Sequence, residues 1–340
     1  MEVSGGRRLS PGWSGVILFV LYFSAIFAPW IAFHAPETQN RRFPDAPPML
    51  LHLAAPADWV DEGFLYVHPQ KLVDPMRRLY EVDATRRIPL QWLVHGHLLA
   101  PAAGNPDVFL LGTDALGRDL FARVLFGGRV SLSIGVVGVL ISFTIGIFVG
   151  VVAGYAGGRV DHLLMRLCEI MMALPAFFFL LALAAVIPPG LSPAQTFFLL
   201  VALMSFIRWA GLARVLRGMT ASIRERDYVQ AARALGASPA RIVIRHVLPA
   251  TFSYTLVAAT LAIPGFILGE SALSLLGVGI QEPGTSWGSL LRDAQNLTNL
   301  DYRPWVLIPG VLIVVATMAF NFLGDRLQDH MDPQAKVAGR

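Results

Sequence analysis

A serine within an apolar run is the first residue whose type and setting suggest chemistry. The stretch GESALS, residues 269–274, offers a Gly-x-Ser pattern like that of an intramembrane serine protease. Such a serine needs a histidine base within hydrogen-bond reach. The apolar run 304–324 contains no histidine, and His246 lies at the far end of the run that carries the serine. The pattern therefore argues against a hydrolase.

A phosphate-binding loop is the second chemistry to test. A transporter that hydrolyses ATP by itself needs the frame G-x-x-x-x-G-K-[ST], whose lysine reaches the phosphates. The chain has only two lysines, Lys71 and Lys336, and neither stands in such a frame. The sequence therefore predicts that this chain is not an enzyme and does not hydrolyse ATP.

Residues that ligate metals are few and poorly spaced. A single cysteine, Cys168, excludes an intrachain disulfide and a cysteine-rich metal site. The polar stretch after the first apolar run holds five histidines, whose spacing matches neither H-x3-H nor H-E-x-x-H. We expect this chain to bind no metal and no cofactor. The five histidines are His34, His52, His68, His95 and His97.

The elements that carry these residues are strongly apolar. Of the 340 residues, 55% are hydrophobic and only 15% are charged, with a mean hydropathy of +0.57; soluble domains carry about 25% charged residues. A bilayer span needs about 20 mainly apolar residues. We therefore expect an all-α membrane protein with six transmembrane helices, the first of them not cleaved. The six runs lie near 13–33, 131–155, 163–187, 195–215, 250–280 and 304–324.

The arginines and lysines of short loops set the orientation of such a protein. With a cytoplasmic N-terminus, fourteen of them fall in inside segments, and two, Arg292 and Arg303, fall in short outside segments. The loop 34–129 is too long to be counted. We expect both termini in the cytoplasm and a multi-pass protein of the cell inner (cytoplasmic) membrane. This placement of the arginines also argues against a nucleic-acid partner, despite a net charge of +4.

Charged residues inside the predicted spans are few, and such groups usually face a bundle interior or a wet cavity. Glu169 and Arg208 lie near the predicted cytoplasmic ends, so an interfacial role and a functional role both stay open. Glu270 lies deeper in the fifth span. It either lines a pathway or caps a helix bent at Pro264, whose ring removes a backbone donor.

The second predicted span carries a small residue at every fourth position. Lipid tails are as apolar as leucine, so membrane helices associate through close backbone approach, which small residues permit. We expect this face to pack against another helix within a bundle. The stripe is formed by Gly138, Ser142, Gly146, Gly150 and Gly154.

A polar segment, YVQAARALGASPARIVIRHVLP (228–249), separates the fourth and fifth apolar runs. Asp227 is a predicted N-cap for a helix that begins at Tyr228, and Gly236 is the predicted left-handed residue that ends it. A helix of two turns is marginal alone in water. We therefore expect it to lie against something, either a partner protein or the surface of an anionic membrane.

A second short helix follows the turn. Ser238 is its predicted N-cap, and Pro239 stands at the first helical position, where the missing donor costs nothing. Leu248 and Pro249 mark the predicted junction with the fifth span, because the residue before a proline resists helical geometry.

One face of the first short helix is predicted to make close contacts, because residues three and four apart share a face. Its small side chains permit close approach. This face carries Tyr228, Ala231, Ala232 and Leu235, whereas Arg226, Gln230 and Arg233 lie away from it.

The polar segment resembles a known motif. QAARALGASPARIVIRHVLP is similar to the EAA loop of ABC-importer permeases, of the form E-A-A-x3-G-x9-I-x-L-P. Gln230 replaces the family's glutamate and His246 replaces its isoleucine; the glutamine keeps a similar shape without the charge. The resemblance implies that the loop 220–249 is a coupling element docked in a cleft of a separate ATPase subunit. The implied coupling residues are Tyr228, Gln230, Ala231, Ala232, Arg233, Gly236, Leu248 and Pro249.

Three further stretches narrow the resemblance to the C-type permease subunit of dipeptide and oligopeptide importers, a group that includes nickel importers. They are LLGTDALGRDLFARVLFGGRVSLSIG (110–135), ESALSLLGVGIQEPGTSWGSLL (270–291) and FNFLGDRLQDHMDP (320–333). The resemblance implies an ABC permease transmembrane domain over 110–333. The other predicted parts are an N-terminal tail with the first transmembrane helix (1–35), an extended external loop (36–109) and a cytoplasmic tail (334–340).

The resemblance implies a transmembrane permease subunit of an ATP-driven importer for peptides, which works by alternating access. The implied partners are a sister permease subunit, two ATP-binding subunits that hold ATP and Mg, an external substrate-binding protein and the lipid bilayer. A permease for nickel or another small solute stays open. From the residues alone, a free-standing secondary transporter or channel also stays open.

Overall fold

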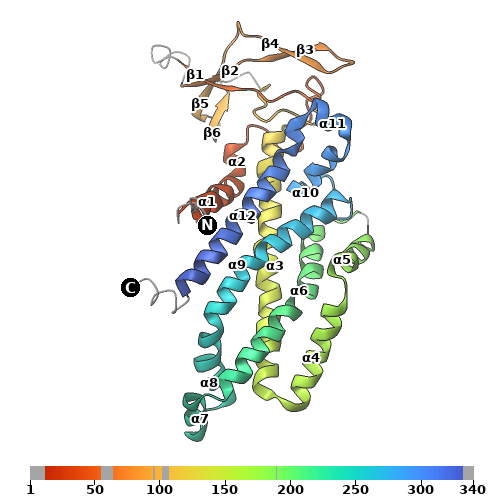
Figure 1. Ribbon diagram of the computed structural model, residues 1–340. Helices are drawn as coiled ribbons and strands as arrows, with labels where there is room; N and C mark the ends of the chain where they lie inside the picture. Colours follow the sequence, from red (N-terminus) through yellow and green to blue (C-terminus); the bar gives the residue numbers. More distant parts are fainter. Residues whose placement is uncertain (1–11, 55–63, 95, 102–106, 189, 332–340) are drawn as a thin grey trace, which may run out of the picture. The chain divides into compact units, whose positions relative to one another are not determined.

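The computed structural model describes residues 12–54, 64–94, 96–101, 107–188 and 190–331. The predicted tail 334–340 and the first eleven residues therefore lie outside the described residues. The chain divides into two compact units. The first unit is Met1–Leu18, Ser133–Leu273 and Val315–Arg340, and the second is Phe19–Leu132 and Ser274–Val314. The helices α3, α9 and α12 each contribute residues to both units (Figure 1).

Helices make up most of the described chain (Figure 1). Short 3-10 and π turns join several of them. The α-helices are α1 (Trp13–Ile26), α2 (Ala28–Ile31), α3 (Leu120–Ala156), α4 (Gly158–Ala173), α5 (Ala176–Ala185), α6 (Pro193–Arg224), α7 (Asp227–Ala234), α8 (Pro239–Ile242), α9 (Leu248–Leu275), α10 (Trp287–Leu290), α11 (Leu297–Tyr302) and α12 (Ile308–Met331). The π turn is η2 (Val243–Val247), and the 3-10 turns are η3 (Leu291–Gln295) and η4 (Pro304–Leu307).

Four of the described helices are long and apolar enough to cross a membrane, and a fifth crossing results if one bent pair is a single span. The helix α1 is apolar but has only 14 residues, which is too short to meet that criterion. The described residues therefore show four or five of the six predicted spans. The four are Leu120–Ala156, Pro193–Arg224, Pro239–Leu275 and Pro304–Met331.

The bent pair is α4 and α5, which fall in the span predicted near 163–187. The two helices meet at an angle of 80°. Leu174 has extended backbone angles, and Pro175 follows it directly. The bend has a local cause, because a residue before proline is driven out of the helical region.

The all-α class predicted for the chain is wrong for the stretch 51–101, which forms β-strands. Four strands pair antiparallel in the order β1-β2-β5-β6, and β3 pairs with β4 as a separate hairpin. Burial alternates along the start of β5, where Ile88 and Leu90 are buried and Gln91 is exposed. The strands are β1 (Leu51–Leu53), β2 (Leu65–Val67), β3 (Gln70–Asp74), β4 (Leu79–Val82), β5 (Ile88–Val94) and β6 (His97–Pro101).

A small hydrophobic core of its own supports this sheet. Its buried residues come from the strands and from the segments on either side of them, so the predicted external loop is a folded element. The core consists of Met49, Val67, Ile88, Leu90, Val108 and Phe109.

An ion-pair cluster in the second unit joins two of the stretches that resemble the permease family. Arg123 is buried in α3 and pairs with Asp114 and, at 2.7 Å, with Glu282. Arg118 donates to the same Glu282 carboxylate at 2.7 Å. Burial alone acts to raise the pKa of Glu282, but the charges of Arg123 and Arg118 outweigh it and lower that pKa.

In the first unit, α3 packs closely against α6 through three glycines of the predicted stripe. A Cβ on Gly146 would lie 3.0 Å from the carbonyl oxygen of Trp209. On Gly150 it would lie 2.5 Å from the carbonyl oxygen of Ala213. On Gly154 it would lie 2.7 Å from the Cβ of Thr220. Side chains larger than hydrogen would therefore separate the two helices.

The same helix approaches α9 at Gly138, about two turns before Gly146. A Cβ on Gly138 would collide with the ring of Phe266. The Ser205 hydroxyl on α6 donates a hydrogen bond of 3.1 Å to the Gly138 carbonyl. Ser142, the remaining member of the stripe, is buried. Three helices therefore meet at the level of Gly138.

We predict that Gly150→Ala destabilises the protein by about 1–3 kcal/mol, the usual range for overpacking. The added Cβ would lie 2.5 Å from a backbone oxygen and 2.9 Å from the Leu216 Cβ, so α3 and α6 must shift. The check is the thermal unfolding midpoint of the detergent-solubilised protein, which should fall. Gly211→Ala on α6 is the matched control, since a Cβ there has nothing within 4 Å; an equal fall in both variants would contradict the packing argument.

Candidate functional site

The candidate site is the polar segment between α6 and α9, which folds as α7, a turn and α8. Arg226 is the N-cap residue of α7, and Asp227 is already its first helical residue. The predicted N-cap role of Asp227 is therefore wrong. A carboxylate in the first helical turn is still favourable, because it faces the positive end of the helix dipole.

The turn after α7 is the one predicted at Gly236, and its left-handed geometry is confirmed. Gly236 has a φ of +84°, which only glycine adopts at low cost. Its N–H donates to the Arg233 carbonyl at 3.0 Å, and the next N–H, of Ala237, donates to the Ala232 carbonyl at 3.1 Å. These two bonds form a Schellman motif, which satisfies carbonyl groups that would otherwise lack partners at the helix end.

The second helix starts as predicted. The Ser238 hydroxyl accepts a hydrogen bond of 3.4 Å from the Arg241 N–H, and Pro239 stands in the first turn. The two short helices are therefore fixed at both sides of the turn by local hydrogen bonds.

The predicted junction at Leu248 and Pro249 coincides with the start of α9, but the expected departure of Leu248 from helical geometry is wrong. Leu248 has helical angles, and its N–H donates to the Val243 carbonyl five residues earlier. The π turn η2 widens the helix just before the proline. A wider turn relieves the clash between a proline ring and the preceding turn, so α8, η2 and α9 run on as one helix.

Val229 anchors α7, although the sequence pattern does not mark it. It is fully buried and packs in a cluster with residues of α3, α6, α8 and η2. Burying a valine side chain stabilises a fold by roughly 1.5–3 kcal/mol. The cluster consists of Val151, Ile223, Val229, Ile242 and Val247.

Gln230, which replaces the glutamate of the motif, makes a defined contact. Its Nε2 donates to the Arg224 carbonyl at 3.1 Å and to the Glu225 Oε2 at 3.3 Å. The Arg224 carbonyl lies at the C-terminal end of α6, where backbone oxygens lack helical partners. The amide of Gln230 therefore ties the end of α6 to α7.

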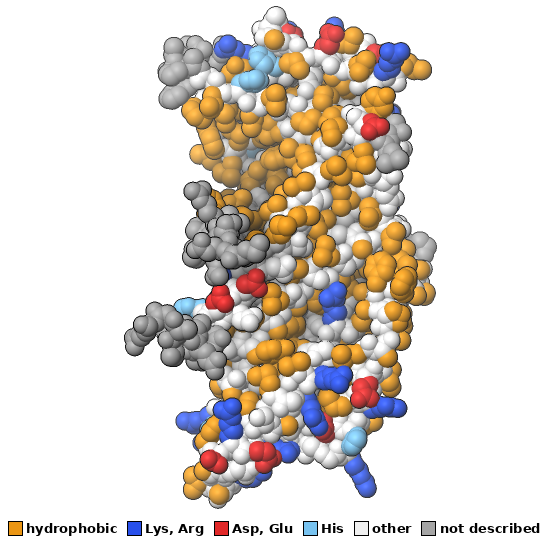
Figure 2. Space-filling model, viewed as in Figure 1, with side chains coloured by type: hydrophobic (Ala, Val, Ile, Leu, Met, Phe, Trp, Pro, Cys, Tyr) orange, Lys and Arg blue, Asp and Glu red, His pale blue; other side chains and the backbone are white. Residues whose placement is uncertain are grey.

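The surface that the turn leaves exposed is apolar and cationic. Leu235 is 88% exposed and Tyr228 is 45% exposed. The Tyr228 ring lies 5.7 Å from that of His246. Ala231 and Arg233 are exposed, and Ala232 is half-buried. In Figure 2, arginine side chains gather around the end of the first unit that carries α7 and α8.

Arg208 and Glu270, two of the charged residues in the apolar helices, make contacts that the sequence does not reveal. The helix α6 extends over Pro193–Arg224, and Arg208 lies near the middle of that helix. Its Nη2 donates to the Gly265 carbonyl at 3.0 Å. Glu270 is fully buried and accepts a hydrogen bond of 3.4 Å from the Ser271 hydroxyl. Glu169 is exposed and pairs with Arg166 at 3.2 Å.

Two of the described histidines, His52 and His68, come together, with ring centroids 5.0 Å apart. His34 lies 3.0 Å from Asp119, and His52 and His68 contact the ring of Tyr66. Among the residues that the structure describes, no three His, Cys, Asp or Glu side chains are placed to hold a metal ion. His95 is outside the described residues.

Long apolar helices, together with a turn anchored where two of them meet, define a multi-pass helical membrane protein. Residues 146–337 match the family described as binding-protein-dependent transport system inner membrane component. Residues 13–51 match the N-terminal TM domain of oligopeptide transport permease C. The chain belongs to the first of these families, and it is a C-type permease subunit of an ABC importer in the inner membrane.

Two relatives illustrate the likeness. The oligopeptide transport system permease protein OppC of Haemophilus influenzae is 42% identical over 239 residues, which cover 70% of this chain and 74% of that protein. The dipeptide transport system permease protein DppC of Bacillus subtilis is 40% identical over 226 residues, 66% of this chain and 68% of that protein. A solved structure of the MetNI methionine ABC transporter shares 19% identity over 61% of this chain and 95% of that chain, with a TM-score of 0.46, too low to carry an argument.

We predict that Gln230→Glu loosens the junction between α6 and α7. The variant loses both donated hydrogen bonds and places a second carboxylate beside Glu225, at a cost of about 1–3 kcal/mol. Amide hydrogen exchange across α7 should accelerate about fivefold or more. Glu225→Gln in the same chain restores a donor and should slow the exchange again. If hydrogen exchange stays fast after the second substitution, the contact between residues 230 and 225 is contradicted.

Proposed function

We propose that this permease subunit carries peptides across the inner membrane by alternating access, driven by separate ATPase subunits. The relatives named above are an oligopeptide and a dipeptide permease, and each is at least 40% identical to this chain over most of its length. The observation that carries the coupling mechanism is the exposed apolar surface of α7 on a helix held rigidly by Val229.

The proposed topology has six spans, with both termini in the cytoplasm. The helices α1 and α2 together cover 13–31, about 28 Å at 1.5 Å per residue, which is close to the 30 Å of a hydrocarbon core. Counting them as the first span and the bent pair α4 and α5 as the third gives six. The excess of arginine in the short segments of one side supports the orientation.

In this proposal the turn 220–249 docks in a cleft of an ATPase subunit. Leu235 and Tyr228 supply the apolar contact, and Ala231 permits close approach at their side. ATP and Mg are held by two such subunits, whose closure displaces α7. Since Val229 is packed with residues of α3, α6 and η2, the displacement reaches the spans. The motif residues Gly236, Leu248 and Pro249 set the geometry of the turn and its continuation into α9.

The remaining parts of the assembly follow from the same proposal. A sister permease subunit completes the pathway, and an external substrate-binding protein delivers the peptide. The glycine stripe of α3 keeps the bundle closely packed, and Glu270 is the proposed pathway group, hidden in this conformation. Substrate loading must then alter ATPase turnover, because coupling between two sites is reciprocal.

Uptake by the complete transporter in proteoliposomes tests the substrate. Labelled trialanine should accumulate in the compartment that holds the ATPase subunits, and only when that compartment also contains ATP. Unlabelled dipeptides, tripeptides and longer peptides should compete, whereas nickel should not. Competition by nickel with none by peptides would replace the peptide assignment with the small-solute one.

We predict that Leu235→Asp releases the ATPase subunits. A charge in the centre of an apolar contact costs at least about 2 kcal/mol, as at other interface hot spots, so the retained ATPase should fall more than tenfold. The measurement is the ratio of ATPase to permease after affinity purification in detergent. Gln328→Asp, which adds the same charge at an exposed position near the end of α12, is the control. Full retention by the Leu235 variant would show that α7 is not the docking element.

A further inference from the structure

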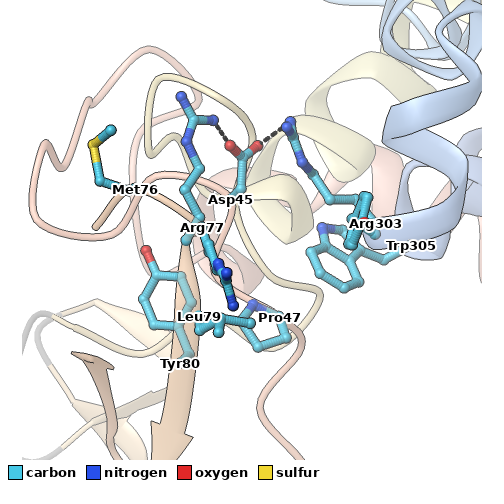
Figure 3. A pocket seen from close by; sticks show the side chains of 10 residues that line it. Asp45, Pro47, Met76, Arg77, Leu79, Tyr80, Arg303 and Trp305 are labelled. Carbon is cyan, nitrogen blue, oxygen red and sulfur yellow. Dashed lines mark hydrogen bonds and ion pairs between the residues drawn. The ribbon is translucent and has the colours of Figure 1, made fainter. Parts of the chain in front are cut away.

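A cavity of about 840 Å³ lies in the second unit, beside the hairpin of β3 and β4. Figure 3 shows its side chains coming from three segments that are far apart in the sequence. They belong to the segment before β1, to the tip and second strand of the hairpin, and to the end of α11 and the start of η4. The lining residues are Asp45, Pro47, Met76, Arg77, Arg78, Leu79, Tyr80, Tyr302, Arg303 and Trp305.

A buried carboxylate organises this cavity. Asp45 forms ion pairs with Arg78 on one side and with Arg303 on the other, drawn as dashed lines in Figure 3. The backbone N–H of Asp45 donates to the Asp114 carbonyl at 2.9 Å. Because a buried charge is stable only when it is paired, Asp45 fixes both arginines at the wall of the cavity.

The hairpin tip is also held in place. The Asp74 Oδ1 accepts hydrogen bonds from the N–H groups of Met76 at 2.9 Å and Arg77 at 3.1 Å. The Tyr80 hydroxyl donates to the Pro44 carbonyl at 2.7 Å. The tip is therefore preordered, and a ligand that binds it loses little free energy to ordering.

The lining carries an excess of positive charge. Three arginines face one aspartate, and the third arginine, Arg77, has a side chain that is 79% exposed. The Asp74 Oδ2 lies 4.0 Å from the Arg77 Nε. An exposed pair at that distance contributes almost nothing. The cavity is therefore complementary to an acidic group.

The rim of the cavity has the composition of a protein interface. Met76 is 93% exposed and Tyr302 is 75% exposed, and Leu79 is exposed beside them. Tyrosine, tryptophan, methionine and arginine are enriched in interface cores, and lysine, which is absent from this lining, is depleted. A pocket for a small ligand would instead enclose it among buried apolar side chains.

We propose that this cavity is the docking surface for the external substrate-binding protein, which inserts an acidic side chain flanked by apolar ones. Arg77 meets the carboxylate, and Met76 and Tyr302 cover the apolar flank. This inference rests on the proposed function, because it assumes an importer that receives its substrate from such a protein. It also gives the folded stretch 51–101 a role in recognition.

The test uses the complete transporter in proteoliposomes and its purified substrate-binding protein loaded with trialanine. Arg77→Glu and Tyr302→Ala should each raise the binding-protein concentration for half-maximal uptake at least tenfold. The maximal rate should stay unchanged, since neither residue belongs to α7 or to the spans. Raising the salt concentration should weaken binding to the wild type but not to the Arg77 variant.

Arg41→Glu is the matched control, because it makes the same charge change at an exposed position outside the cavity lining. It should leave the half-saturating concentration unchanged. An unchanged half-saturating concentration in both Arg77→Glu and Tyr302→Ala would overturn the inference. A changed preference among peptides without a changed half-saturating concentration would also overturn it and would assign the cavity to the substrate. If the wild type takes up no peptide at all, the proposed function fails instead, which is a distinguishable result.

A photo-crosslinking residue at position 76 gives an independent readout. In the complete transporter it should capture the loaded binding protein, and a fivefold excess of free binding protein should reduce the labelled product. The control places the same residue at Leu50, another exposed apolar position of the second unit that is not part of the lining. Equal capture at both positions would contradict a specific docking surface.

Discussion

The burial of Val229 is the contact on which the position of α7 depends. A helix of eight residues such as α7 is too short to be stable or oriented by itself. The valine holds it by packing among side chains of α3, α6, α8 and η2. Protein interiors are close-packed and transmit displacement instead of absorbing it. A movement imposed on the exposed side of α7, where Leu235 projects, must therefore shift the ends of three long helices together.

The helix α3 extends this linkage along the membrane-spanning part. Near its end, Val151 belongs to the cluster around Val229, and on the same helix Gly146, Gly150 and Gly154 touch α6. Gly138 then brings α9 against it. In lipid the hydrophobic effect does not hold helices together, so association depends on such close van der Waals contacts. The absence of side chains at the glycines is thus what allows α3 to join the end that carries α7 to the middle of the bundle.

Local rules predicted the parts of the site that depend on local hydrogen bonds, and they failed where distant contacts decide. Gly236 and Ser238 were predictable because a left-handed cap and an N-cap involve only a few neighbouring residues. Pro249 was not, because a π turn before it removes the clash on which the rule depends. Val229 carries no periodic signal in an alanine-rich helix, since its partners lie far away in the chain. The strands of 51–101 were not predicted, because β1 and β2 have only three residues each, too few to show the alternation that identifies a strand.

The glutamine in the motif is explained by the partners it meets. Gln230 faces the carbonyl of Arg224 and the carboxylate of Glu225, and both groups only accept hydrogen bonds. A glutamate at this position would add a third acceptor to a place that needs a donor. The Glu225 carboxylate also pairs with the Arg224 guanidinium at 2.9 Å. The amide of Gln230 therefore adds the missing donor to a junction that already holds an ion pair, and it secures the position of α7 there.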